Sequence, residues 1–310
     1  MIQTEKPKVI VICGPTGIGK TELSLSLAEG FNGCIVSADS MQIYRHMNIG
    51  TAKPDAQERS RVPHYMMDVA DPDEAFSAAR FSKEGRQAID QILGMRKLPF
   101  VVGGTGLYIR ALLHGLFETE SVDPVIIRQL ENAVDVHGAG RLHDRLAVCD
   151  PKAAARIHPN DAYRIIRALA VFEATGRPVS EVQKDHGFKE CPFDVLKICL
   201  NMDRNVLYDR INQRVDAMVA GGLLYEVKQL LEMGYASQLR PMQAIGYRHM
   251  ADFIEGRVSW DDTIFLLKRD TRRFAKRQLT WFTKEPDMIW ALPDEKAAIS
   301  EWVRGFLTSL

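Results

Sequence analysis

The sequence predicts an α/β fold in which a parallel sheet is flanked by helices and interrupted by an inserted all-helical domain. Short apolar runs rich in β-branched residues alternate with helical stretches near both ends of the 310-residue chain, as is typical of a parallel sheet. The alternation stops at about residue 118 and returns at about residue 192. We therefore expect a core domain of residues 1–117 and 192–310 and a helical insertion of residues 118–191.

The composition is that of a globular protein with an ample core. Hydrophobic residues make up 46% and charged residues 26% of the chain. The net charge is formally zero, so a nucleic acid would have to be bound by a local basic patch. The five cysteines form no C-x-x-C pair, which favours reduced thiols over a zinc site. No apolar run has the length of a membrane span, and we expect a cytoplasmic monomer without a membrane partner.

A phosphate-binding loop follows the first predicted strand, residues 9–13, and precedes a predicted helix at 22–29. The loop has the pattern G-x-x-x-x-G-K-T and consists of Gly14, Pro15, Thr16, Gly17, Ile18, Gly19, Lys20 and Thr21. Its glycines let the backbone turn sharply, so that successive amides and the helix N-terminus can cradle an anion.

This strand, loop and helix predict a sheet of the P-loop NTPase type that binds a polyphosphate. Lys20 is expected to reach the terminal phosphate, and the Thr21 hydroxyl is expected to ligate Mg²⁺. The motif does not specify which polyphosphate is bound or what happens to it.

Two further strand ends carry polar residues toward this loop. A strand at 34–38 ends at Asp39, and a strand at 98–102 is followed by the glycine-rich residues 103–106, which include Thr105. The carboxyl ends of parallel strands line the ligand crevice. Asp39 is therefore interpreted as a Mg²⁺ contact or a general base, although strand-end aspartates also serve as caps. Thr105 can hydrogen bond to a phosphate or a base and can cap the helix predicted at 107–114.

Arginines in two other predicted helices are candidates for phosphate contacts. A strand at 195–200 leads into a helix at 205–220, in which Arg210 and Arg214 lie one turn apart. Either arginine can clamp a phosphate near the sheet. In the insertion, Arg164 and Arg167 share one helix face, and their spacing does not separate a phosphate grip from a solvated surface.

The last long helix, about residues 261–283, has a basic stripe with interleaved aromatic residues. A one-sided stripe on a chain of zero net charge favours a nucleic-acid partner over an ordinary solvated face. The stripe consists of Lys268, Arg269, Arg272, Arg273, Lys276 and Arg277.

Together these motifs resemble the tRNA dimethylallyltransferase family of the bacterial type. The most particular segments are D-S-M-Q-I-Y at 39–44, I-G-T-A-K-P at 49–54 and K-R-Q-L-T-W-F at 276–282. Further matching segments lie at 14–21, 103–108, 164–169, 173–176 and 244–248, in the order that the family has them.

The resemblance implies Mg²⁺-assisted transfer of a dimethylallyl group from dimethylallyl diphosphate to the exocyclic amine of an adenine beside the anticodon of tRNA. It also implies that Asp39 is the base, with Thr105 nearby, and that Arg214 is an additional diphosphate ligand. The acceptor adenine would be flipped out of its stack. The residues then implied to bind the anticodon stem-loop are Asp39, Ser40, Met41, Gln42, Thr105, Arg164, Arg167, Gln243, Gly246, Tyr247, Arg248, Arg273, Lys276 and Arg277.

Three other functions are compatible with parts of the sequence. A small-molecule kinase with a P-loop fits the first 115 residues equally well, but it leaves the basic stripe unexplained. A nucleotide-switched RNA-binding module would need a guanine-reading N-K-x-D segment, which the sequence lacks. A prenyltransferase for free adenylate would need neither the insertion nor the stripe.

Overall fold

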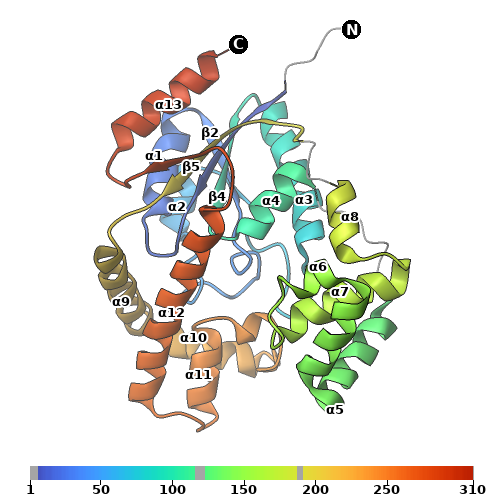
Figure 1. Ribbon diagram of the computed structural model, residues 1–310. Helices are drawn as coiled ribbons and strands as arrows, with labels where there is room; N and C mark the ends of the chain where they lie inside the picture. Colours follow the sequence, from blue (N-terminus) through green and yellow to red (C-terminus); the bar gives the residue numbers. More distant parts are fainter. Residues whose placement is uncertain (1–5, 116–122, 187–190, 310) are drawn as a thin grey trace. The chain divides into compact units, whose positions relative to one another are not determined.

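The computed structural model describes residues 6–115, 123–186 and 191–309, and within them it contains a six-stranded sheet (Figure 1). All strand pairs are parallel, in the order β3-β2-β4-β1-β5-β6. The predicted fold class is therefore confirmed. The strands are β1 (Lys8–Cys13), β2 (Gly33–Ser37), β3 (His64–Tyr65), β4 (Leu98–Gly103), β5 (Asp194–Leu200) and β6 (Met288–Ala291).

Helices cover both faces of the sheet because the central strands are apolar on both sides. Val9 and Val11 of β1 face one core, and Ile10 and Ile12 face the other. The first core is closed by α3 (Ala78–Gly94), α4 (Gly106–His114), α10 (Leu223–Glu232) and α11 (Tyr247–Ile254). The second core is closed by α1 (Lys20–Gly30), α9 (Arg204–Ala220) and α13 (Lys296–Thr308). The sheet therefore packs against a layer of helices on each face, and this packing positions the ends of its strands.

The register of the central strands brings three loops to one edge of the sheet. Cys13 of β1 lies opposite Gly103 of β4 and Cys199 of β5, and Ser37 of β2 lies opposite Val102. The chain leaves each strand at nearly the same level. The phosphate-binding loop, the segment after β2 and the glycine-rich segment after β4 are therefore neighbours.

The long helix α12 (Trp260–Phe282) runs from this edge of the sheet past α9 and α11 (Figure 1). Its last turns pack closely on the segment after β4, where a Cβ on Gly106 would lie 2.1 Å from Nε1 of the Trp281 ring. A Cβ on Gly104 would lie 2.2 Å from Nε2 of Gln278, and a Cβ on Gly103 would lie 2.1 Å from the carbonyl oxygen of Ala38. The glycines at the end of β4 and just after it thus allow α12 and the segment after β2 to pack closely against this backbone.

Three local features differ from the elements that the sequence predicts. The short helix α2 (Ala56–Arg61) and the two-residue strand β3 were not predicted. The sequence of residues 242–248, which follows Pro241, favours a further helix, but residues Pro241–Gln243 form a 3₁₀ turn and α11 begins only at Tyr247. The cause is Gly246, whose φ of 97° interrupts helical geometry.

Residues 114–190 form a compact unit of their own, and residues 1–113 and 191–310 form the other. The described part of the smaller unit is helical, and its apolar core includes Leu146, Ile165 and Leu169. Gly138, with φ 79° and ψ 156°, interrupts the first of its helices. These helices are α5 (Pro124–Cys149), α6 (Pro151–Ala154), α7 (Ala162–Thr175) and α8 (Val179–His186).

Candidate active site

The phosphate-binding loop has the backbone geometry that its glycines permit. Gly14, Gly17 and Gly19 have φ values of 140°, 79° and 104°, in the region that favours glycine. A Cβ on Gly14 would also lie 2.8 Å from the carbonyl oxygen of Leu200. Ile18 is fully buried in the core, so this residue can offer a ligand only its backbone. The loop is therefore a rigid cradle next to the N-terminus of α1.

Lys20 is the first residue of α1, and its ammonium group lies over the loop. Its Nζ donates hydrogen bonds to the carbonyl oxygens of Gly14, at 3.0 Å, and Pro15, at 2.8 Å. Burial and, to a smaller extent, the charge of Arg214 lower the pKa of Lys20 to about 8, although the charge of Asp39 opposes both effects. Burial also lowers the pKa of Arg214, again against the effect of Asp39. Two partly buried cations thus lie near one carboxylate, an arrangement that suits a polyanionic ligand.

Asp39 begins a tight turn that holds its carboxylate in place. One carboxylate oxygen, Oδ1, accepts hydrogen bonds from the amides of Met41, at 2.9 Å, and Gln42, at 3.4 Å. The Thr105 hydroxyl oxygen accepts a hydrogen bond from the amide of Ser40 at 3.0 Å, and the Thr105 amide donates to Ala38 at 3.1 Å. The turn after β2 is therefore pinned to the segment after β4, with Oδ2 of Asp39 left available to a substrate.

Gln278 of α12 joins the phosphate-binding loop to the segment after β4. Its Oε1 accepts a hydrogen bond from the Thr16 amide at 2.8 Å, and its Nε2 donates to the Gly104 carbonyl at 2.9 Å. No motif in the sequence predicts a role for this residue. A glutamine on a basic helix has no local signal, because both partners come from other parts of the chain.

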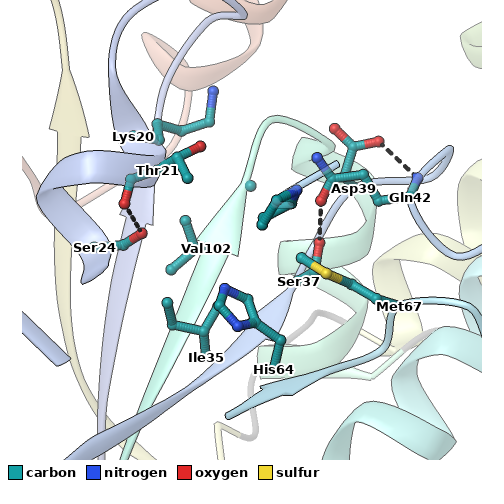
Figure 2. A pocket seen from close by; sticks show the side chains of 12 residues that line it. Lys20, Thr21, Ser24, Ile35, Ser37, Asp39, Gln42, His64, Met67 and Val102 are labelled. Carbon is teal, nitrogen blue, oxygen red and sulfur yellow. Dashed lines mark hydrogen bonds between the residues drawn. The ribbon is translucent and has the colours of Figure 1, made fainter. Parts of the chain in front are cut away.

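Two cavities meet at Asp39, which lines both. The larger has a volume of about 530 Å³, and the smaller, beside Lys20 and Thr21, has a volume of about 50 Å³ (Figure 2). Most of the predicted site residues of the core line the larger cavity, namely Thr16, Asp39, Ser40, Met41, Thr105, Arg214, Gln243, Gly246, Tyr247, Arg248, Arg273 and Arg277.

Other predicted residues lie elsewhere. Gln42 lines the smaller cavity, and its Nε2 donates to the carbonyls of Thr51 and Ala52. Lys276 is exposed on α12. In the helical unit, Arg164 and Arg167 are exposed on α7, and Arg164 pairs with Asp161 at 3.1 Å. Their contacts with tRNA remain predictions.

The basic stripe on α12 is narrower than the sequence indicates. Lys268 pairs with Asp216 at 2.7 Å, Arg269 with Asp270 at 2.9 Å, and Arg272 donates a hydrogen bond to Asn212. These three cations are bound within the protein. The exposed part of the stripe consists of Arg273, Lys276 and Arg277.

A buried carboxylate anchors the loop that forms one wall of the larger cavity. Glu226 of α10 is only 7% exposed and accepts hydrogen bonds from the amides of Asn48, Ile49 and Gly50 at 2.8–3.1 Å. The hydroxyl of the fully buried Tyr247 donates to the same carboxylate at 2.6 Å. A Cβ on Gly50 would lie 2.5 Å from the Tyr247 ring. Glu226 therefore positions the I-G-T-A-K-P segment.

Replacing Glu226 with glutamine is expected to lower both stability and turnover. The amide nitrogen cannot accept the bonds that a carboxylate oxygen accepts, so buried donors lose their partner. We expect the free energy of unfolding to fall by about 1.5–3 kcal/mol. Displacement of Gly50 and Thr51 is expected to lower kcat about 10-fold. Glu232→Gln, at an exposed position of the same helix, is the control in denaturation and rate measurements, and equal effects of the two variants would contradict the anchoring role.

Comparison with known proteins identifies the family. The model of the family described as "IPP transferase" matches residues 42–285. The chain belongs to the IPP transferase family. A tRNA dimethylallyltransferase from Desulfosudis oleivorans is 54% identical over 96% of this chain and 94% of its own. One from Desulfatibacillum aliphaticivorans is 49% identical over 97% of this chain and 99% of its own.

Solved structures of IPP transferase relatives have the same fold. A tRNA isopentenylpyrophosphate transferase from Bacillus halodurans has a TM-score of 0.73 at 42% identity, with 97% of each chain covered. A eukaryotic dimethylallyltransferase acting on tRNA has a TM-score of 0.81 at 32% identity, covering 96% of this chain and 80% of that chain. The relatives are prenyltransferases, so they support the predicted enzyme class and not a small-molecule kinase.

The described part of the chain contains no helix that is both long and apolar enough to cross a membrane.

Proposed function

We propose that this enzyme transfers a dimethylallyl group from dimethylallyl diphosphate to the N6 amine of the adenosine on the 3′ side of the anticodon in tRNA. The observation that carries the proposal is the position of Asp39 at the junction of two cavities, facing Lys20 and Arg214. A diphosphate in the cradle and an adenine in the larger cavity would meet at this carboxylate.

The cradle would hold the leaving group. The loop amides, Lys20 and Arg214 would bind the diphosphate and stabilise the negative charge that grows on it as the carbon–oxygen bond breaks. The electron pair of that bond leaves with the diphosphate. This use of a P-loop needs no phosphoryl transfer.

Asp39 would serve as the general base. The amine lone pair forms the new nitrogen–carbon bond, and the amine proton passes to the free Oδ2 of Asp39. Oδ1 stays bonded to the turn amides, so the carboxylate keeps its orientation during the transfer. Thr105 would keep that turn aligned through its bond to Ser40.

The donor set beside the cradle fits Mg²⁺. Within residues 6–115, 123–186 and 191–309, no group of three or more His, Cys, Asp or Glu side chains is arranged to hold a metal ion. Mg²⁺ in phosphate sites commonly takes one or two protein ligands and completes its shell with water and substrate phosphates. The Thr21 hydroxyl would hold the ion, which would supply further neutralisation of the diphosphate charge.

The larger cavity would receive the flipped adenine, and the exposed cations of α12 would hold the phosphates around it. A single-stranded anticodon loop lowers the cost of extruding the base. Arg248, Arg273 and Arg277 line the cavity and are suited to contact the flanking nucleotides. The contribution of the helical unit through Arg164 and Arg167, the cytoplasmic location and the monomeric state stay predictions.

The double variant Arg273→Ala and Lys276→Ala is expected to weaken tRNA binding and flatten its salt dependence. Each lost phosphate contact reduces the slope of log K against log salt by about 0.7–0.9, so the double variant should lose about 1.4–1.8. The matched control is Lys296→Ala with Arg304→Ala, which removes the same charges from exposed positions of α13. An unchanged slope in the α12 variant would assign these residues to ordinary surface.

The proposed reaction is tested directly by incubating the protein with unmodified tRNA, dimethylallyl diphosphate and Mg²⁺. Mass analysis of the digested nucleosides should show one adenosine per acceptor tRNA heavier by one dimethylallyl group in place of a proton. Position mapping should place it next to the anticodon. Phosphate transfer from ATP to a small acceptor, with no prenylated nucleoside, would overturn the proposal.

A further inference from the structure

The wall of the larger cavity contains a carboxylate that has no task in the reaction as proposed so far. Asp270 of α12 lines this cavity together with Arg248 and Arg273. Its Oδ2 accepts a hydrogen bond from Nη2 of Arg248 at 3.2 Å. Its Oδ1 lies 2.9 Å from Nε of Arg269 and 3.7 Å from Nη1 of Arg273. One carboxylate thus contacts three arginines, two of which line the space proposed for the acceptor nucleotide.

A histidine of α11 holds the same carboxylate from within the protein. His249 is 5% exposed, and its Nε2 lies 3.3 Å from Oδ2 of Asp270. Its Nδ1 accepts a hydrogen bond from the amide of Gly246 at 3.3 Å, so the proton of the neutral ring is on Nε2 and is donated to Asp270. Burial and the charge of Arg248 lower the pKa of His249, so the ring is neutral at physiological pH. The carboxylate is therefore fixed by α11 while it contacts the arginines.

Asp270 is charged at neutral pH. Burial alone would raise the pKa of its carboxyl group, but hydrogen bonds from Arg269 and His249 hold that pKa below its ordinary value. The Asp270 side chain is 16% exposed, whereas the side chains of Arg248 and Arg273 are 42% and 62% exposed. An RNA phosphate can therefore reach the two guanidinium groups more easily than the carboxylate.

We propose that Asp270 is a positioning residue that makes RNA binding at the larger cavity selective. It holds Arg248 and Arg273 in fixed places and offsets part of their charge. These arginines then bind tightly only those phosphates that the fold of the RNA brings to the same places. The inference rests on the proposed function, which puts the nucleotides beside the flipped adenine at these two arginines.

The argument follows from the difference between specific and non-specific RNA binding. An unrestrained arginine binds any phosphate that comes near, and such contacts supply essentially all of the non-specific affinity. At Arg248 and Arg273 a phosphate must instead compete with a carboxylate that is already in contact. A phosphate that arrives in the right place loses less, because the guanidinium group needs no reordering. A carboxylate that weakens the wrong complex more than the right one increases specificity.

An ion pair that only joins α11 to α12 would explain the same contacts. The two helices lie side by side (Figure 1), and Asp270 of one contacts Arg248 and His249 of the other. Removing a purely structural pair would destabilise the protein and weaken its binding of any RNA. Removing a residue that confers selectivity would strengthen the binding of the wrong RNA. The direction of this change separates the two roles.

The first test compares the affinities of two RNAs for the full-length protein by fluorescence anisotropy. One RNA is an anticodon stem-loop with adenosine on the 3′ side of the anticodon, and the other is an unstructured oligouridine of equal length. Asp270→Asn should strengthen oligouridine binding about 5-fold and steepen the slope of log K against log salt by about 0.7, the value for one further phosphate contact with a single strand. Affinity for the stem-loop should stay within about 2-fold, because the lost negative charge and the lost positioning have opposite effects.

Asp216→Asn is the matched control. Asp216 is an exposed residue of α9 whose Oδ1 lies 2.7 Å from Nζ of Lys268 on α12, but it does not line the larger cavity. The substitution removes the same charge from a partner of an α12 cation, and both affinities should stay within about 2-fold. Asp270→Ala, which suits a helix position, is a second variant and should act in the same direction as Asp270→Asn.

The second test determines whether Asp270 acts through the two arginines of the cavity. In a protein that already carries Arg248→Ala and Arg273→Ala, Asp270→Asn should change oligouridine affinity by less than about 2-fold. Neither arginine of the cavity then remains to be released.

Weaker binding of oligouridine by both Asp270 variants, an equal gain in Asp216→Asn, or a gain that persists without the two arginines would overturn the inference. So would an unaltered protein that binds the two RNAs equally. A protein that shows the expected changes in binding but transfers no dimethylallyl group to tRNA would support the inference and count against the proposed reaction.

Discussion

Replacing Asp39 with asparagine is expected to lower kcat for prenyl transfer by about 10²–10⁴-fold, the range that a general base contributes. Asparagine has the same shape and keeps an oxygen at Oδ1, so the bonds from the Met41 and Gln42 amides persist. It cannot accept the amine proton at the second position. Single-turnover rates with saturating tRNA and donor measure the loss, and filter binding should show tRNA affinity within about 3-fold of the unaltered protein.

Asp39→Ala separates this chemical role from a structural one. Alanine removes both the base and the two hydrogen bonds that hold the turn, so it should also weaken tRNA binding. If asparagine restored most of the turnover that alanine loses, the carboxylate would be holding the turn and another group would be accepting the proton. Loss of turnover in both variants, with binding retained only in asparagine, is the result that the geometry predicts.

The sheet could be predicted from the sequence because its central strands are local patterns. The runs at β1, β2, β4 and β5 are apolar on both faces and stand between helical stretches, so composition alone reveals them. The strand β3 has only two residues and exists because His64 and Tyr65 pair with β2. Such a strand has no periodicity of its own and could not be predicted.

In the candidate site, too, residues in local sequence patterns could be predicted, and residues that act through remote partners could not. The phosphate-binding loop is contiguous, and Asp39 and Thr105 each follow a recognisable strand, so their proximity follows from a parallel sheet. Gln278 and Glu226 act through partners that are remote in sequence: 262 residues separate Gln278 from Thr16, and 177 separate Glu226 from Ile49. No local pattern marks a polar side chain whose partners are assembled only by folding. The basic stripe was predicted too wide for the same reason. Lys268 belongs to the stripe by its position in the sequence, but its acidic partner Asp216 lies on another helix.

Lys20→Met is expected to lower kcat/KM for the prenyl donor by at least 10³-fold. A charge-assisted hydrogen bond contributes about 1.5–3 kcal/mol, so donor affinity should fall about 10- to 100-fold. Loss of the cation also removes stabilisation of the departing diphosphate, which should lower kcat by a further 10²–10³-fold. Lys296→Met, at an exposed position of α13, is the control for loss of a lysine charge.

The pH dependence of donor binding supplies a second readout of the same group. In the free protein burial lowers the pKa of Lys20 to about 8, and a bound diphosphate raises it by favouring the charged form. Below pH 8 the lysine is charged before and after binding, so it adds no pH dependence. Above pH 8 binding must take up a proton, and donor affinity should fall by up to about 10-fold per pH unit.

Calorimetry in two buffers of different ionisation enthalpy measures this proton uptake directly. In Lys20→Met, proton uptake by the donor itself is unchanged, but the proton uptake that begins near pH 8 should be lost. The difference in proton uptake between the unaltered protein and Lys20→Met therefore belongs to the lysine. If the step survived in Lys20→Met, the titrating group would lie elsewhere in the cradle and the charge that grips the diphosphate would have to be reassigned. A step that disappears while kcat also falls would tie the buried ammonium to both binding and bond breaking.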